Sequence, residues 1–180
     1  MSVDLQALYP KLIHLMLDAV FVVDADHKIL FVSDACESLL GYRADELVGT
    51  LITHYMPPED LAITKASIRR VMNGQPHLDF RNRYLHKNGS VVHVLWSARW
   101  SDEEQVRIGV ARDVTAQVQA EDDLRFLAHH DPLTKLTNRS LFYGRLEAAL
   151  STAKRYQNRF ALLFLDVNDF KQIGRASCRE

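Results

Sequence analysis

"LDFRNRYLHKNGSVVHVLWSARW", residues 78–100, contains two runs in which apolar and polar side chains alternate. Alternation with a period of two is the pattern of a half-buried β-strand. The two runs are joined through Asn88-Gly89, a dipeptide that favours the tight turns of β-hairpins. In the first run the side chains predicted to share one face are Leu78, Phe80, Asn82 and Tyr84; in the second they are Val92, Val94, Trp96, Ala98 and Trp100. The stretch therefore predicts an antiparallel hairpin.

Further strands are predicted on both sides of this hairpin. Two short β-rich runs, 20–23 and 29–32, flank a polar turn at 24–28, and a third run covers 106–112. The chain thus has two strands, then a helical region, then three strands. Elements that are segregated in this way indicate an α+β fold with an antiparallel sheet.

The helical region between the strand groups is broken into short pieces. Gly41 and Gly49 are predicted to end two short helices, because glycine readily adopts the left-handed conformation found after a helix. Pro57-Pro58 stops whatever precedes it. A longer helix then runs to about Met72 and ends at Asn73-Gly74.

Composition narrows the class of protein. The chain has 180 residues, of which 47% are hydrophobic and 25% charged, with a net charge of −1. These values fit a globular protein and give no basic footprint for nucleic acid, so no nucleic-acid partner is expected. Cys36 and Cys178 cannot form a disulfide framework and suit a reducing compartment. No signal peptide or membrane-spanning run is found, so we expect the protein in the cytoplasm.

A connector helix is predicted over 116–130, with Thr115 as its N-cap. Ala120, Leu124 and Leu127 recur at spacings of four and three, the seam of a two-stranded coiled coil. One interpretation is a parallel helix pair that aligns two protomers in a homodimer. The other is a single amphipathic helix that packs on its own domain.

The segment after the connector carries a second pattern. Asp131-Pro132 ends the connector, and Asn138 is predicted to cap a helix over 139–156. "FALLFLDV", residues 160–167, is a continuous apolar run that predicts a strand buried on both faces.

Residues 12–115 resemble a PAS sensor domain. The stretches that carry the resemblance are "AVFVVDADHKILFVSDACESLLGY", "HKNGSVVHVLWSA" and the closing "GVARDVT". The resemblance implies a five-stranded sheet and short helices that enclose a pocket. Asn82, Trp96 and His54 are the candidates to line it. The resemblance also argues against haem and covalent flavin. Residues 60–72, where haem-binding PAS domains place an axial ligand, contain no His, and residues 49–60, the region comparable to the reactive-Cys motif of flavin photosensors, contain no Cys.

Residues 131–173 look like the start of a GGDEF domain, the catalytic domain of diguanylate cyclases. The matching motifs are "DPLTKLTNR" (131–139) and "LDVNDFKQI" (165–173). The resemblance implies Mg²⁺ bound by the Asp166 carboxylate and the Val167 carbonyl, oxygen ligands of the kind this ion prefers. It also implies that backbone around Phe170 and Lys171 lies near the phosphates of GTP. Asn168 stands where the family has a second Asp.

The GG(D/E)EF turn and the guanine-reading residues of that family are missing from the sequence. The final "IGRASCRE" equals the translation of a common sequencing adapter, so 174–180 is expected to be a non-native tail. The expected divisions are a lead-in (1–11), the PAS domain (12–115), the connector (116–130), a truncated GGDEF segment (131–173) and this tail.

Two functions are compatible with these patterns. The first is a sensory and dimerisation PAS module that regulates a diguanylate cyclase, which condenses two GTP into cyclic di-GMP. The alternative is a free-standing PAS module that binds a ligand or another protein and has no enzymatic output. In either case we expect the polypeptide as written to be inactive; under the first interpretation the intact protein would be a cyclase.

Overall fold

The computed structural model describes residue 8, residue 11 and residues 13–165. The chain divides into two compact units, Met1–Asp123 and Leu124–Glu180. Each unit is described by itself.

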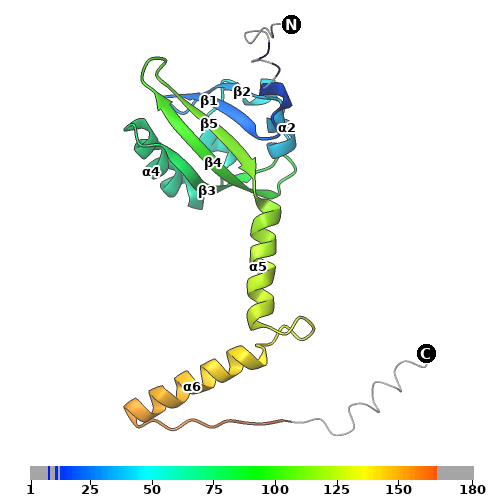
Figure 1. The fold of residues 1–180 in the computed structure, drawn as a ribbon, viewed down its shortest axis with the longest axis vertical. Coiled ribbons are helices and arrows are strands. Elements are labelled where there is room, and N and C mark those ends of the chain that lie inside the picture. The colour runs from blue at the N-terminus through cyan, green and yellow to red at the C-terminus, as the bar shows by residue number, and fades with distance from the viewer. Residues whose placement is uncertain (1–7, 9–10, 12, 166–180) are drawn as a thin grey trace, which may run out of the picture. The chain divides into compact units, whose positions relative to one another are not determined.

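The first unit is built on an antiparallel sheet of five strands (Figure 1). Their spatial order is β2-β1-β5-β4-β3. The strands are β1 (Ala19–Asp24), β2 (Ile29–Val32), β3 (His77–Leu85), β4 (Val91–Ser101) and β5 (Val106–Asp113). The predicted α+β architecture and its five strands are confirmed. Because β1 and β5 are central neighbours, the first and last strands of the domain meet in the middle of the sheet.

The hairpin between β3 and β4 turns at Asn88-Gly89, as predicted. His86 donates its backbone N–H to the carbonyl of Ser90 at 2.8 Å, and the Asn88 side chain accepts from the Ser90 N–H at 2.9 Å. Gly89 has a φ of 87°, a left-handed conformation that glycine adopts without strain. The sequence therefore fixes this turn locally.

A β-bulge near the start of β3 makes one predicted facing wrong. His77 pairs with Ala98, whereas Phe80 pairs with Trp96, so β3 holds an extra residue between the two pairs. An extra residue reverses the alternation on one side of the bulge. Leu78 consequently leaves the inner face and is 58% exposed, while Asn82 and Tyr84 are buried.

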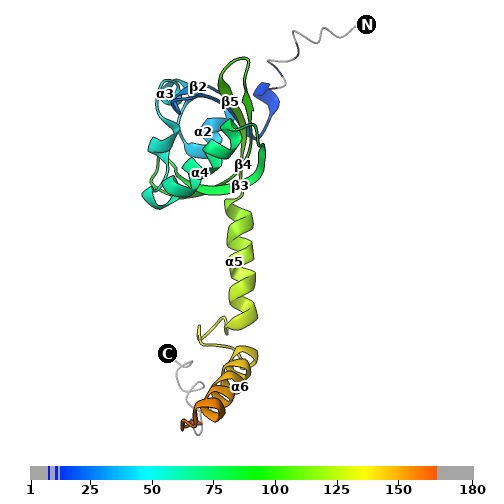
Figure 2. The same ribbon diagram turned by 90° about the vertical axis from the view of Figure 1, so that its left-hand side faces the viewer.

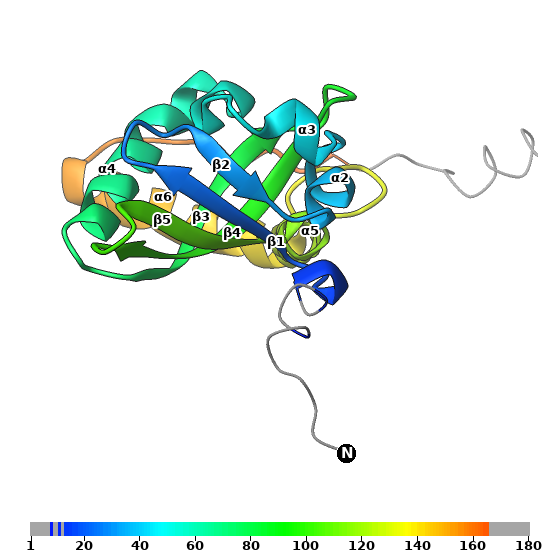
Figure 3. The same ribbon diagram turned by 90° about the horizontal axis from the view of Figure 1, so that it is seen from above.

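Short helices cover one face of the sheet (Figures 2 and 3). They are α2 (Ala35–Leu40), α3 (Ala44–Leu47), η1 (Ile52–Tyr55), η2 (Pro58–Asp60) and α4 (Leu61–Met72). The predicted stops are confirmed, since Gly41 caps α2 with a φ of 75° and α4 ends at Met72 before Asn73. The core lies between this layer and the sheet, and its largest fully buried side chains include Phe21, Ile29, Leu40 and Leu47.

Helix α5 (Thr115–His129) follows β5 directly. The prediction that the Thr115 hydroxyl caps it is wrong. The Asp113 carboxylate accepts from the Thr115 N–H at 2.7 Å, whereas the Thr115 hydroxyl accepts from the His93 N–H at 2.9 Å. Thr115 is therefore used to fasten the start of the helix to β4.

The second unit contains α6 (Arg139–Tyr156), whose predicted bounds and N-cap are confirmed. The Asn138 side chain accepts a hydrogen bond from the Leu141 N–H at 3.0 Å. In the preceding loop Asp131 accepts from the Leu133 and Thr134 N–H groups at 3.1 and 2.8 Å. The loop that carries the "DPLTKLTNR" motif is thus ordered by its own polar side chains.

The strand predicted for 160–167 does not form over the part that the structure describes, 160–165. Leu163, Phe164 and Leu165 are 78%, 83% and 85% exposed. A buried strand needs neighbours on both edges and cover on both faces, and the described residues of this unit contain no other strand. The apolar run has the composition of a buried strand, but it lacks the neighbouring strands with which it would pair.

Candidate functional site

A cavity of about 40 Å³ lies between the sheet and α4. Its apolar wall includes Phe21 of β1, Ile68 of α4 and Trp96 of β4. Trp96 packs edge-on against the ring of Phe21 and tilted against that of Tyr84, with ring centroids 5.3 and 5.8 Å away. The cavity is therefore framed by the inner faces of the central strands.

Asn82 and Trp96, two of the three predicted pocket residues, both line this cavity. They also bond to each other, because the Trp96 Nε1–H donates to Asn82 Oδ1 at 3.1 Å. The Asn82 amide in turn donates to the Thr64 hydroxyl at 3.0 Å. The buried amide thus has protein partners at both ends and does not require a ligand to satisfy it.

His54, the third predicted residue, does not line the cavity. It lies exposed in η1, which presents Ile52 to the cavity instead. In a 3₁₀ turn side chains three residues apart lie above one another, so Ile52 and His54 cannot share a face. The prediction for His54 is therefore wrong.

Arg107 of β5 is the charged residue of the cavity wall, and sequence reasoning missed it. The residue is 7% exposed, and its Nη1 has no hydrogen-bond partner. Burial lowers the pKa of Arg107 from its ordinary value. An arginine nevertheless stays protonated in a protein, so the cavity carries a positive charge.

The other polar groups on the wall are neutral, and Asn82, Thr64 and Ser67 each have a hydrogen-bond partner. The Ser67 hydroxyl lies 2.7 Å from His77 Nδ1. Burial raises the pKa of Tyr84, so its phenol keeps its proton. Arg107 thus differs from them because it is charged and its Nη1 has no hydrogen-bond partner.

Cys36 behaves as a buried thiol. It is 0% exposed, and its Sγ donates to the Tyr42 carbonyl at 3.4 Å. Burial raises its pKa to about 11, so the reactive thiolate is disfavoured. Cys36 therefore serves as a small buried core residue.

The candidate residues of the second motif, Asp166, Val167, Phe170 and Lys171, lie outside the described residues. Among the residues that are described, no group of three His, Cys, Asp or Glu side chains is placed to hold a metal ion. No helix in the described part of the chain is long and apolar enough to cross a bilayer.

The fold and cavity define a sensor-type α+β domain, and comparison with known proteins gives its family. The model of the PAS fold matches residues 7–114, more than half of the chain, and the model of the diguanylate cyclase GGDEF domain matches residues 128–176. The chain belongs to the PAS family and carries a partial GGDEF match behind the PAS domain.

Curated relatives match either most of the chain or a shorter part of it. A diguanylate cyclase of Vibrio cholerae serotype O1 is 24% identical over 161 residues, which cover 86% of this chain and 50% of the relative. The bifunctional diguanylate cyclase/cyclic di-GMP phosphodiesterase MucR of Pseudomonas aeruginosa is 47% identical over 62 residues, which cover 34% of this chain and 9% of the relative. The chain spans half or less of the length of these relatives.

Solved structures match the first unit. One is a domain of a sensory box sensor histidine kinase/response regulator from Geobacter sulfurreducens, with a TM-score of 0.54 and 28% identity. The match covers 61% of this chain and 94% of the Geobacter chain. A PAS domain from Colwellia psychrerythraea has a TM-score of 0.56 and 24% identity. The match covers 63% of this chain and 99% of the Colwellia chain. Both likenesses agree with the PAS fold.

Proposed function

We propose that this chain is the sensory and dimerisation module of a cytoplasmic cyclic di-GMP signalling protein. In the intact protein, occupancy of the PAS cavity regulates a GGDEF domain that condenses two GTP into cyclic di-GMP. The observation that carries the proposal is the path of β5. This strand lines the cavity through Arg107 and Gly109 and continues into α5, ahead of the segment that matches the GGDEF model.

Contacts at the start of α5 support a link between the cavity and the helix. Val114 donates its N–H to the His93 carbonyl at 2.9 Å, and His93 donates its own to the Thr115 hydroxyl. Nearly two turns further along, Glu121 pairs with Arg81 of β3 at 3.5 Å. A shift of β4 or β3, which both line the cavity, would therefore displace the base of the helix.

The apolar stripe of α5 supports dimerisation. In the described chain Leu124 is 68% and Leu127 is 51% exposed, and α5 buries none of its side chains. Exposed leucines at coiled-coil spacing are stabilised when a second helix covers them. We propose a second copy of α5 as that helix, because a GGDEF enzyme brings two GTP-bearing domains together and a dimer supplies this proximity.

For the catalytic half, the proposal follows the family resemblance. Diguanylate cyclases of the GGDEF type use Mg²⁺, whose charge stabilises the transferring phosphoryl group. We assign the Asp166 carboxylate and the Val167 carbonyl as ligands and place the phosphates of GTP near Phe170 and Lys171. Asn168 in place of the family's second Asp removes one negative charge from this motif.

The dimer is tested by replacing both seam leucines in the 180-residue chain, Leu124→Lys with Leu127→Lys. Like charges facing one another across the seam should weaken association by roughly tenfold or more, about 1.4 kcal/mol. Sedimentation velocity over a range of concentrations measures the change.

A matched control places two lysines elsewhere on the same helix, Gln119→Lys with His129→Lys. Both positions are exposed, and at 100° per residue neither falls on the side of Leu124 and Leu127. The control should sediment as the unmodified chain does. Equal association of the seam and control variants, or a monomeric unmodified chain, would contradict the proposed interface.

A further inference from the structure

The guanidinium of Arg107 lacks a counter-ion. Its Nη1 is buried without a hydrogen-bond partner, and no ion pair within the described residues involves it. The Asp24 carboxylate acts on Arg107 without forming an ion pair with it, and its Oδ1 already accepts from the Asp26 and Lys28 N–H groups. Tyr84 also acts on Arg107 but is a neutral phenol. A buried charge left in this state destabilises the fold.

The rest of the cavity wall is either apolar or, at Asn82 and Ser67, already hydrogen-bonded within the protein. Asn82 is satisfied by Thr64 and Trp96, and Ser67 by His77. The remaining lining side chains are aliphatic or aromatic, apart from the phenol of Tyr84. The complement of this surface is a molecule with one anionic end and an apolar body.

Size limits that molecule further. A single water needs roughly 10–15 Å³ measured in the same way, so about 40 Å³ admits only a few heavy atoms. A phosphate group would bring more acceptor oxygens than the wall has free donors. A carboxylate offers two, and its planar geometry matches that of a guanidinium.

We propose that the PAS cavity binds a small monocarboxylate of roughly two to four carbons, whose carboxylate pairs with the guanidinium of Arg107. The alkyl chain lies against the apolar wall formed by Phe21, Ile68 and Trp96. This assignment rests on the proposed sensory role, for which it names the class of ligand.

The first test uses the unmodified 180-residue chain and four probes: acetate, propionate, butyrate and butyramide. Calorimetric titration at constant ionic strength separates specific binding from screening. A ligand with so few atoms binds in the micromolar to millimolar range at best. At least one carboxylate should bind roughly 10- to 100-fold more tightly than butyramide, which has the size of butyrate without its charge. Equal binding of butyrate and butyramide, or no carboxylate binding at millimolar concentration, would overturn the proposal and leave water as the partner of Nη1.

The second test compares Arg107→Met with Arg99→Met. Arg99 lies exposed on β4, and its register partner Ile108 is the neighbour of Arg107. Arg107→Met should weaken carboxylate binding by roughly 10- to 100-fold, whereas Arg99→Met should leave it unchanged.

Without ligand, Arg107→Met should unfold at the same or a higher urea concentration, because it removes an unpaired buried charge. Unchanged binding by Arg107→Met, or a clear loss of stability without ligand, would show that Arg107 has a structural role instead. Either result leaves the dimer experiment unaffected, so the two proposals fail separately.

Discussion

Asp60 and Arg83 join the start of α4 to β3, the two elements on either side of the cavity. The Asp60 carboxylate accepts the Arg83 backbone N–H at 2.7 Å and its Nη2–H at 2.6 Å. The Asp60 side chain is 8% exposed and that of Arg83 is 40% exposed. The carboxylate thus satisfies both a strand N–H and a guanidinium at one point.

Asp60→Asn should lower the free energy of unfolding by about 1–3 kcal/mol, because the half-buried guanidinium loses its charged acceptor. Urea denaturation followed by tryptophan fluorescence measures this, since both tryptophans lie on β4. Asp45→Asn is the matched control, because Asp45 pairs with Arg43 at 2.9 Å on the exposed surface. The control should unfold with the unmodified chain, and a loss as large as that of Asp60→Asn would contradict the special role of the buried pair.

The same pair should give the domain a defined dependence on acid. Hydrogen bonding to Arg83 lowers the pKa of Asp60 from its ordinary value of 3.8. A carboxyl group with a depressed pKa contributes its full stability above the unfolded value and loses it as the pH falls through the folded value. The difference in unfolding free energy between the unmodified chain and Asp60→Asn should be constant above about pH 5 and shrink below pH 3.8. A difference that grows on acidification would have the wrong sign.

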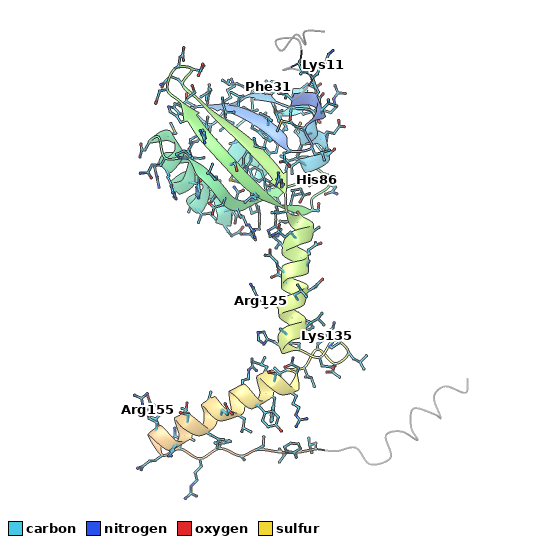
Figure 4. The ribbon with its side chains drawn as sticks, viewed as in Figure 1. Lys11, Phe31, His86, Arg125, Lys135 and Arg155 are labelled. Atoms are coloured by element: carbon cyan, nitrogen blue, oxygen red, sulfur yellow. The ribbon has the colours of Figure 1, made fainter. Side chains whose placement is uncertain are left out.

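Gly41→Ala should destabilise the PAS domain for two reasons. Gly41 has a φ of 75°, and a Cβ there would overlap the ring of His86, which Figure 4 shows near the end of β3. Moving that ring disturbs the hairpin, because His86 Nδ1 accepts from the Asn88 N–H at 3.1 Å. The left-handed backbone costs about 1–2 kcal/mol and the overlap roughly 1–3 more.

Gly74→Ala separates the two causes. Gly74 has nearly the same φ, 76°, and no atom lies within 4 Å of the position that a Cβ would take, so only the backbone strain applies. Equal urea midpoints for the two variants would mean that His86 moves aside freely.

The strands were predictable because alternation and the Asn88-Gly89 turn are local signals. The bulge in β3 was not, since one extra residue leaves the composition of the strand unchanged while it turns Leu78 outward and His77 inward. Packing decides such a facing, and the partner of β3 is known only once the sheet has formed.

The cavity was predictable in part. Asn82 and Trp96 follow from the alternation of their strands, but Arg107 was missed because β5 alternates misleadingly. Val106, Ile108 and Val110 give the more apolar face, yet the inward residues are Arg107, Gly109 and Ala111. Small residues are needed there because Trp96 fills the space, and a Cβ on Gly109 would lie 3.3 Å from its ring. The available signal for an inward Arg107 was that it alternates with two small residues, Gly109 and Ala111, on one face of β5.

The 180-residue chain should make no cyclic di-GMP from GTP and Mg²⁺, because it contains neither a GG(D/E)EF run nor the guanine-reading residues of the family. A protein in which the same segment continues into a complete GGDEF domain should make it. In that protein Asp166→Asn should lower turnover by roughly 10²-fold or more, since a lost carboxylate ligand weakens the hold on the metal that stabilises the transferring phosphoryl group. Chromatography of the product measures all three.

The control for the metal assignment is Asp102→Asn in the complete protein. Asp102 lies exposed in the turn between β4 and β5, so the substitution removes the same charge far from the proposed ligands in sequence. Turnover by this control should equal that of the unmodified protein, and excess Mg²⁺ should partly restore Asp166→Asn, because a weakened site fills again at higher metal concentration. Full activity of Asp166→Asn would remove Asp166 from the metal site, and cyclic di-GMP made by the 180-residue chain would show that the missing residues are dispensable.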